Sequence, residues 1–239
     1  MLERLEYVRL APRVVLDAGS GPPRRELRKR YPQAIVVALD FALPMLRRTG
    51  LVARLFHTPA LPVCADLERL PLADASVDLV WSNMALHWLG EPHAAFAEFR
   101  RVLAPDGLLM FSTLGPDSLK ELRAAGGPPR VHGFIDMHDL GDMLLAAGFA
   151  APVMDMELIR LAYPDADKLL SDLRASGQTN ARADRPRGLA GRRFCATLRR
   201  SLGERPEVTY EVVYGHAWKP APAKSDPQVK TVRVFKSIS

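Results

Sequence analysis

Apolar and polar residues divide the first half of the chain into segments of two kinds. Apolar runs of roughly four to eight residues, bounded by glycine, proline or aspartate, predict buried strands. The segments between them place apolar residues three or four positions apart, which is typical of helices packed on a sheet. The alternation predicts an α/β, doubly wound, mostly parallel sheet between two helical layers. The expected strands are 13–17, 35–40, 62–65, 76–83 and 108–113, and the expected helices are 1–10, a segment after Pro22, 43–54 and 92–103.

The pattern changes after Thr113. Residues 115–137 are rich in glycine and proline and include a short expected helix, so we interpret them as a lid-like insertion or a long surface loop. Two further helices and two further strands complete one domain over residues 1–219. Residues 220–239, rich in proline, lysine and serine, are expected to be a partly disordered tail. The later elements are helices 117–125, 136–147 and 165–175 and strands 154–161 and 209–217.

The first candidate for chemistry lies between the first two expected strands. The apolar run 14–16 leads into Asp17 and a turn with Gly19 and Gly21, and the next strand ends on Asp40. An acid about 20 residues after a glycine turn is typical of a nucleotide site at the carboxyl ends of parallel strands. The glycines let the backbone approach the ligand, and the carboxylate accepts the ribose hydroxyls. The sequence therefore predicts an adenosine-containing cofactor.

These residues resemble a known family. The segment 17–21 with Asp40, the acid within 64–68, and the motif 72–83 followed by 103–108 are similar to class I S-adenosylmethionine-dependent methyltransferases. The segments 81–88, 111–119, 137–141 and 177–180 resemble, more narrowly, the malonyl-acyl-carrier-protein O-methyltransferases of biotin synthesis. The similarity extends from about Arg13 to about Trp218. It implies a seven-stranded sheet in which 209–217 is the antiparallel strand.

The resemblance also implies roles for individual residues. Asp17 is expected near the sulfonium and amino group of S-adenosylmethionine, Asp40 on the ribose and Asp66 with the Leu67 backbone at the adenine amine. The candidates for cofactor binding are Asp17, Gly19, Gly21, Asp40, Asp66, Leu67 and Asn83. His87, Trp88 and Ser112 follow later strands and are candidates for the wall of the substrate pocket. The implied reaction methylates the free carboxylate of malonyl-acyl carrier protein.

Two departures from the family pattern affect the cofactor site. Pro23 stands where the family commonly has a small residue, and proline removes a backbone donor. Relatives carry a helical segment before the first strand, whereas Met1 here lies almost at that strand. The first departure predicts weakened cofactor binding, and the second indicates either a truncated chain or a more open pocket. They leave two alternatives: a non-catalytic scaffold with this fold, or a related enzyme that hydroxylates or otherwise modifies a protein side chain.

Composition and charge limit the partners. The 239 residues carry a net charge of +6, which suits an acidic protein such as a carrier protein, or simply a solvated basic surface. Two cysteines without a motif indicate a reducing, cytoplasmic location, and no apolar run is long enough for a membrane span. The cluster Asp136, His138, Asp139 and Asp142 is interpreted as solvated acids and a helix cap rather than a metal site.

A second basic feature lies near the end of the chain. Eight arginines occupy positions 182, 185, 187, 192, 193, 199, 200 and 205. Aromatic residues are nearly absent from this stretch, which argues against single-strand nucleic-acid binding. The stretch from Arg182 to Arg205 is therefore either a docking face for an acidic carrier protein or a plain solvated face.

Overall fold

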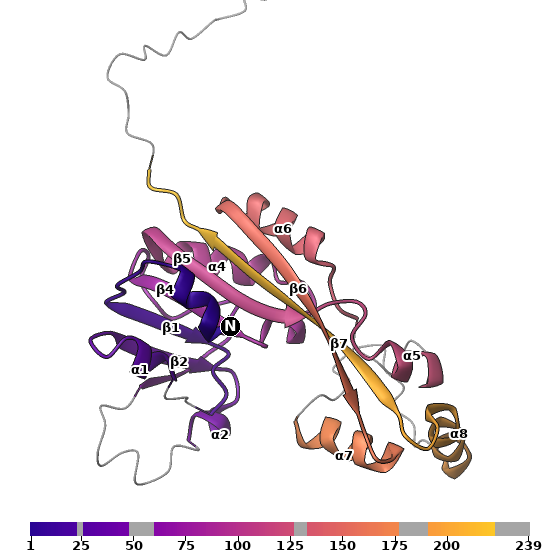
Figure 1. Ribbon diagram of the computed structural model, residues 1–239. Helices are drawn as coiled ribbons and strands as arrows, with labels where there is room; N and C mark the ends of the chain where they lie inside the picture. The colour runs from indigo at the N-terminus through magenta and orange to yellow at the C-terminus, as the bar shows by residue number, and fades with distance from the viewer. Residues whose placement is uncertain (23–25, 48–59, 127–132, 177–190, 223–239) are drawn as a thin grey trace, which may run out of the picture.

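The computed structural model describes residues 1–22, 26–47, 60–126, 133–176 and 191–222, and its seven strands form one sheet (Figure 1). The strand order is β3-β2-β1-β4-β5-β7-β6. β7 is antiparallel to both of its neighbours and the other six strands are parallel, which confirms the expected topology. The strands are β1 (Val14–Ala18), β2 (Ile35–Asp40), β3 (Leu61–Cys64), β4 (Val77–Asn83), β5 (Leu103–Leu114), β6 (Ala150–Ala162) and β7 (Glu207–Trp218).

Helices cover both faces of the sheet. On one face, Phe96 and Phe99 of α4 and Leu140 of α6 pack against strand residues such as Leu109 and Phe111. On the other face, Leu5 and Leu27 pack with Val15 and Met110. The helices are η1 (Leu2–Tyr7), α1 (Glu26–Arg30), α2 (Leu43–Leu46), η2 (Leu86–Trp88), α4 (His93–Val102), α5 (Lys120–Gly126), α6 (Met137–Ala146), α7 (Ala166–Ala175) and α8 (Arg192–Leu202).

The strands β6 and β7 extend beyond the rest of the sheet. Leu114, the last residue of β5, lies opposite Val212, so the first part of β7 pairs only with β6. Around this extension α5, α7 and α8 gather, apart from β1 and β2 (Figure 1). Leu119, Leu169, Leu173 and Val208 form their common core. We call α5, α7, α8 and the extended parts of β6 and β7 the distal unit.

The helix α8 is a finding that the sequence pattern did not predict. Its apolar stripe consists of Phe194, Leu198 and Leu202, which are spaced by one helical turn. Arginines flank this stripe, so the sequence analysis identified the positive charge of the segment but not its helix.

Parts of other predictions lie outside the described residues. They are Pro23, residues 48–54 of the expected helix 43–54, residues 127–132 of the expected lid, the arginines at 182, 185 and 187, and the tail from 223 onward.

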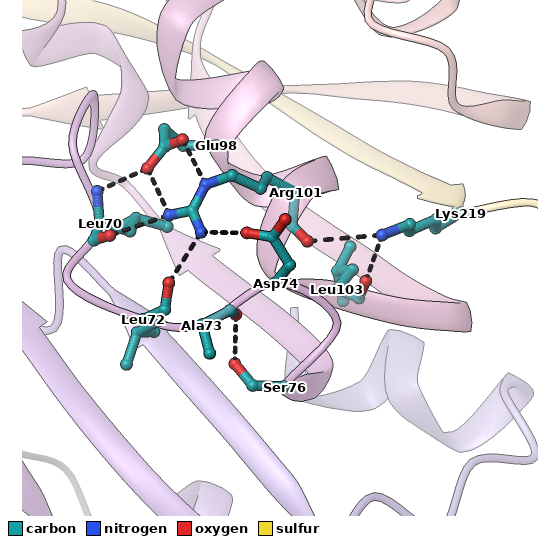
Figure 2. A network of polar contacts seen from close by, with 9 residues as sticks. All are labelled: Leu70, Leu72, Ala73, Asp74, Ser76, Glu98, Arg101, Leu103 and Lys219. Carbon is teal, nitrogen blue, oxygen red and sulfur yellow. Dashed lines mark hydrogen bonds and ion pairs between the residues drawn. The ribbon is translucent and has the colours of Figure 1, made fainter.

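The amino ends of the parallel strands are joined by a polar network (Figure 2). The Arg101 guanidinium donates to both oxygens of Glu98 at 2.7 and 2.8 Å, to the backbone oxygens of Leu70 and Leu72, and to Asp74 at 2.7 Å. Lys219 Nζ, beyond the end of β7, donates to Leu103 O at 2.6 Å. The hydrogen bonds from Arg101 hold the pKa of Glu98 below its usual value. Leu72 and Asp74, at the start of the motif 72–83 that resembles the family, therefore serve the architecture of this edge.

Candidate active site

The glycine turn after β1 is held against the end of β2. The backbone N–H groups of Gly19 and Ser20 both donate to Leu39 O, at 2.8 and 2.9 Å. Gly19 has φ +74° and Gly21 has φ +58°, which favour glycine. A Cβ on Gly19 would collide with Ala85, whereas a Cβ on Gly21 would meet nothing within 4 Å. Gly19 thus permits close packing of two loops, and Gly21 faces open space.

Asp40 closes the same turn from the end of β2. Its Oδ2 accepts a hydrogen bond from Gly21 N at 2.8 Å, and its Oδ1 accepts one from Ala42 N at 2.7 Å. A carboxylate offers about four acceptor positions, so each oxygen keeps capacity for a further donor. The acid that the sequence assigns to the ribose is therefore fixed by the backbone and lies beside the open space at Gly21.

Asp17 and the segment after β3 complete the predicted cofactor residues on this side. Asp17 is buried near the end of β1, between Ala38 of β2 and Trp81 of β4 in the sheet register.

The turn after β3 is shaped by Asp66. Its Oδ1 accepts a hydrogen bond from Glu68 N at 3.0 Å, across the turn that carries Leu67. The Leu67 side chain lies 3.9 Å from the position of a Cβ on Gly19. Three loops, after β1, β3 and β4, thus meet around Gly19.

Asn83 is positioned by Ser112. The Ser112 hydroxyl donates to Asn83 Oδ1 at 3.0 Å and accepts from Met84 N at 3.2 Å. Ser112 is buried. Its hydroxyl therefore orients the end of β4 from within the protein and does not form part of an exposed pocket surface. Met84 follows with φ +57°, an unusual conformation for a residue with a side chain, and such conformations cluster at functional sites. Nothing in the sequence pattern identified Met84.

An aromatic group lies next to this strand end. His87 is buried, its ring centroid lies 5.2 Å from that of Trp88, and it makes an edge contact with Phe134 at 6.2 Å. Trp88 is exposed to 39%. His87 and Trp88 are neighbours in the chain, and the structure adds Phe134, which comes from the segment before α6. Its contribution could not be found from the sequence, because the contact joins residues far apart in the chain.

The loop after β5 is held by a buried acid of β7, which the sequence analysis also missed. Glu211 Oε2 accepts from Asp117 N at 2.7 Å, and Glu211 O accepts from Gly115 N at 2.8 Å. The Ser118 hydroxyl bonds both the N–H and the C=O of Glu211. A Cβ on Gly115 would collide with the Glu211 carboxylate. Gly115 therefore admits the carboxylate that fixes the loop.

The acidic cluster on α6 has the role of a helix cap. Asp136 Oδ1 accepts from His138 N at 2.8 Å, and this bond lowers the pKa of Asp136. Asp139 and Asp142 are exposed. Within the described ranges, no three His, Cys, Asp or Glu side chains gather as metal ligands. The described helices also include none that is long and apolar enough to cross a membrane.

Comparisons with known proteins agree with this geometry. A family model described as a methyltransferase domain matches residues 16–111, which run from β1 into β5. A malonyl-[acyl-carrier protein] O-methyltransferase of Methylovorus sp. (strain MP688) is 53% identical over 92% of this chain and 80% of its own. The protein of that name from Gallionella capsiferriformans is 52% identical over 93% and 82%. This chain belongs to the malonyl-[acyl-carrier protein] O-methyltransferase family.

Solved structures share the fold of this family member. The YcgJ protein of Bacillus subtilis has a TM-score of 0.65 at 17% identity, over 93% of this chain and 97% of its own. A phosphoethanolamine N-methyltransferase 2 of Haemonchus contortus, solved with S-adenosyl-L-methionine, has a TM-score of 0.57 at 13% identity, over 91% and 51%. Family and fold make this chain an S-adenosylmethionine-dependent O-methyltransferase of class I. The open space at Gly21 beside the Asp40 carboxylate fits the adenosine half of that cofactor.

Proposed function

We propose that this chain methylates the free carboxylate of a malonyl group carried by acyl carrier protein. The observation that carries the proposal is the identity of more than half of the residues with relatives named for that activity. We further propose that the cofactor is held by Asp17, Gly19, Gly21, Asp40, Asp66, Leu67 and Asn83. When bound, S-adenosylmethionine supplies an electrophilic methyl group.

In this proposal Asp40 accepts hydrogen bonds from both ribose hydroxyls. Its two oxygens are held by the N–H groups of Gly21 and Ala42, so the carboxylate keeps one orientation before the cofactor arrives. Gly21 leaves room for the ribose because no atom lies near the position of its missing Cβ. Asn83, oriented by Ser112, lies at the end of β4 on the same edge of the sheet. The site is thus organised in advance, which reduces the cost of ordering it on binding.

The acceptor explains the kind of chemistry that the residues must perform. A malonyl carboxylate is ionised at neutral pH, so its oxygen can take the methyl group without a general base. Bound S-adenosylmethionine would supply the methyl group to this oxygen, with the electron pair of the broken carbon–sulfur bond left on the sulfur. The task of the protein is therefore alignment and exclusion of water. His87, Trp88 and Phe134 form the aromatic group that would exclude water beside the end of β4.

A methyl-transfer assay tests the proposal. The chain is incubated with S-adenosylmethionine and malonyl-acyl carrier protein, and the carrier is analysed by mass spectrometry for a gain of one methylene. Acetyl-acyl carrier protein is the matched control, since it has the same thioester but no free carboxylate. We expect the malonyl form alone to be converted to the ester.

Two results would contradict the proposal. Tight binding of S-adenosylhomocysteine without ester formation would favour the scaffold alternative. Conversion of a protein side chain, with malonyl carrier protein left unchanged, would favour the side-chain-modifying alternative. Both alternatives keep the fold and the family membership, so the assay discriminates by product alone.

A further inference from the structure

The helix α8 presents an arginine face that the methyl-transfer site does not use. Leu198 is buried, and Phe194, Cys195 and Leu202 on the same side are partly buried. Arg193 and Arg200 lie seven positions apart on the opposite stripe, which corresponds to about two helical turns. Arg192 lies on a flank of the helix, seven positions before Arg199, and Arg192, Arg193 and Arg200 are all exposed. We call Arg192, Arg193 and Arg200 the α8 arginine face.

The charge of this face is not neutralised within the described residues. Arg199, at the flank of α8, forms an ion pair with Asp167 of α7 at 2.7 Å. Lys168 and Lys120, on the other two helices of the distal unit, are likewise paired with Asp172 and Asp117. The three members of the α8 arginine face have no such partner in the part of the chain that the structure describes. Glu204, Arg205 and Glu207 follow α8 and are exposed, so two acids and one further arginine border the face.

The position of two arginines is also unfavourable for helix stability. Arg192 and Arg193 begin α8, and the first turn contains no acidic residue. The positive end of the helix dipole lies there, and cations at that end cost about 0.3–1 kcal/mol each. Acidic residues or serines at these two positions would cap the helix and keep the surface soluble without this cost. The arrangement is better explained by a negatively charged partner.

The distal unit lies at the correct edge of the sheet for such a partner to reach the site. It extends past the carboxyl ends of the parallel strands, where Asp17, Asp40, Asn83 and Ser112 lie (Figure 1).

The length of β7 gives the separation between α8 and the site. From Glu207 to Tyr214, the residue opposite Ser112, β7 spans roughly 23 Å at about 3.3 Å per residue. Leu202 of α8 packs against the cluster that contains Val208, next to Glu207. An acyl carrier protein presents its acyl group on a long pantetheine arm and is itself acidic, so it matches both the charge and the separation.

We propose that the α8 arginine face docks the acidic surface of the acyl carrier protein while the pantetheine arm reaches toward the end of β4 and the aromatic group of His87, Trp88 and Phe134. This inference rests on the proposed function. An arginine guanidinium can donate two parallel hydrogen bonds to one carboxylate. Exposed charges at an interface mainly change the rate of association and its dependence on salt. The face therefore governs the KM for the carrier substrate and leaves the chemical step unaffected.

The test compares two charge-reversed variants on two substrates. Arg193→Glu with Arg200→Glu alters the α8 arginine face. Arg9→Glu with Lys29→Glu changes the net charge equally at exposed positions outside the distal unit and outside the proposed cofactor site. Each protein is assayed with malonyl-acyl carrier protein and with malonyl-pantetheine, which has the same thioester but no carrier. We expect the α8 reversal to raise the KM for the carrier substrate about tenfold or more, and the control reversal to change it less than about twofold. The kinetics with malonyl-pantetheine should be unchanged in both.

Two further measurements sharpen the result. Arg193→Gln with Arg200→Gln removes charge without reversing it and should give an intermediate KM. Added salt should raise the KM for the carrier substrate of the unmodified chain more steeply than that of the α8 reversal, because it screens the attraction that the variant has lost.

The outcomes separate this inference from the proposed function. If the unmodified chain methylates neither malonyl substrate, the proposed function is wrong. If it methylates both, and the two charge reversals have equal KM values for the carrier, the docking face is wrong. An equal loss of activity on malonyl-pantetheine in the α8 reversal would also overturn the docking face, because α8 would then act through the fold of the site.

Discussion

At the amino edge of the parallel strands, the Glu98 carboxylate lies against the Arg101 guanidinium, whereas at the carboxyl edge the Asp40 carboxylate accepts two backbone N–H groups. Among the described residues neither Asp40 nor Asp66 has an ion pair. The positive charge of a neighbouring cation neutralises an acid within the fold. Backbone N–H groups orient an acid but bring no opposite net charge. Glu98 and Asp40 are therefore held in different ways, and in the proposed function it is Asp40 that receives a ligand. Asp78, at the amino edge, also accepts two backbone N–H groups, from Arg13 and Val14.

The largest effect is expected for Asp40→Ala on cofactor affinity. The substitution removes the acceptor for two ribose hydroxyls and also releases Gly21 and Ala42 from their hydrogen bonds. Loss of two hydrogen bonds to a charged group should cost on the order of 3 kcal/mol, or roughly 150-fold in affinity. Titration calorimetry with S-adenosylhomocysteine measures the change. Asp74→Ala is the control at the other edge and should leave the affinity unchanged; equal losses in the two variants would remove the contrast.

The second prediction concerns Arg101→Ala and the stability of the amino edge. The substitution leaves Glu98 without its cation and removes donors from Leu70 O and Leu72 O. Because Arg101 and Glu98 are only 31% and 21% exposed, we expect the free energy of unfolding to fall by about 2–3 kcal/mol. Denaturant unfolding checks this value, and S-adenosylhomocysteine affinity should stay within about twofold of the unmodified chain.

Arg101→Lys separates charge from geometry at this position. Lysine keeps the positive charge but cannot reproduce the planar fork that joins Glu98, Asp74 and two carbonyl groups. An intermediate stability is expected. If the lysine variant matched the unmodified chain, the network would act through charge alone.

The sequence predicted local features better than contacts between distant segments. The alternation of strands and helices, the glycine turn and the placing of Asp17 and Asp40 at strand ends follow from periodicity and from the family motif, because these features are set by neighbouring residues. The Arg101 network, the Phe134 contact and the Glu211 carboxylate against Gly115 join segments far apart in the chain, and only packing determines them. The helix α8 was missed because its arginines obscured a short apolar stripe.

A third, smaller effect is expected for Gly21→Ala. The positive φ of Gly21 costs an alanine about 1–2 kcal/mol, and no atom lies where the new methyl group would stand. The free energy of unfolding should therefore fall by about 1 kcal/mol, and S-adenosylhomocysteine should bind more weakly if the ribose occupies that space. Gly90→Ala is a suitable control, since Gly90 also faces open space but has no positive φ. Unchanged affinity in Gly21→Ala would place the ribose elsewhere on this edge.

The smallest effect is a pH dependence that comes from Glu98 at the amino edge. The hydrogen bonds from Arg101 lower the pKa of Glu98 in the folded chain, so the unfolded chain binds the proton more readily. The resulting stabilisation is present above the unfolded glutamate pKa of about 4.3 and is lost as the pH falls through the lower folded pKa. Because Glu98 is partly exposed, the difference should be below about 1 kcal/mol. Unfolding of the unmodified chain and of Glu98→Gln is compared at pH 7 and near pH 3.5. The stability gap between them should narrow at the lower pH, and a gap that stayed constant would show that the proton affinity of Glu98 does not change on folding.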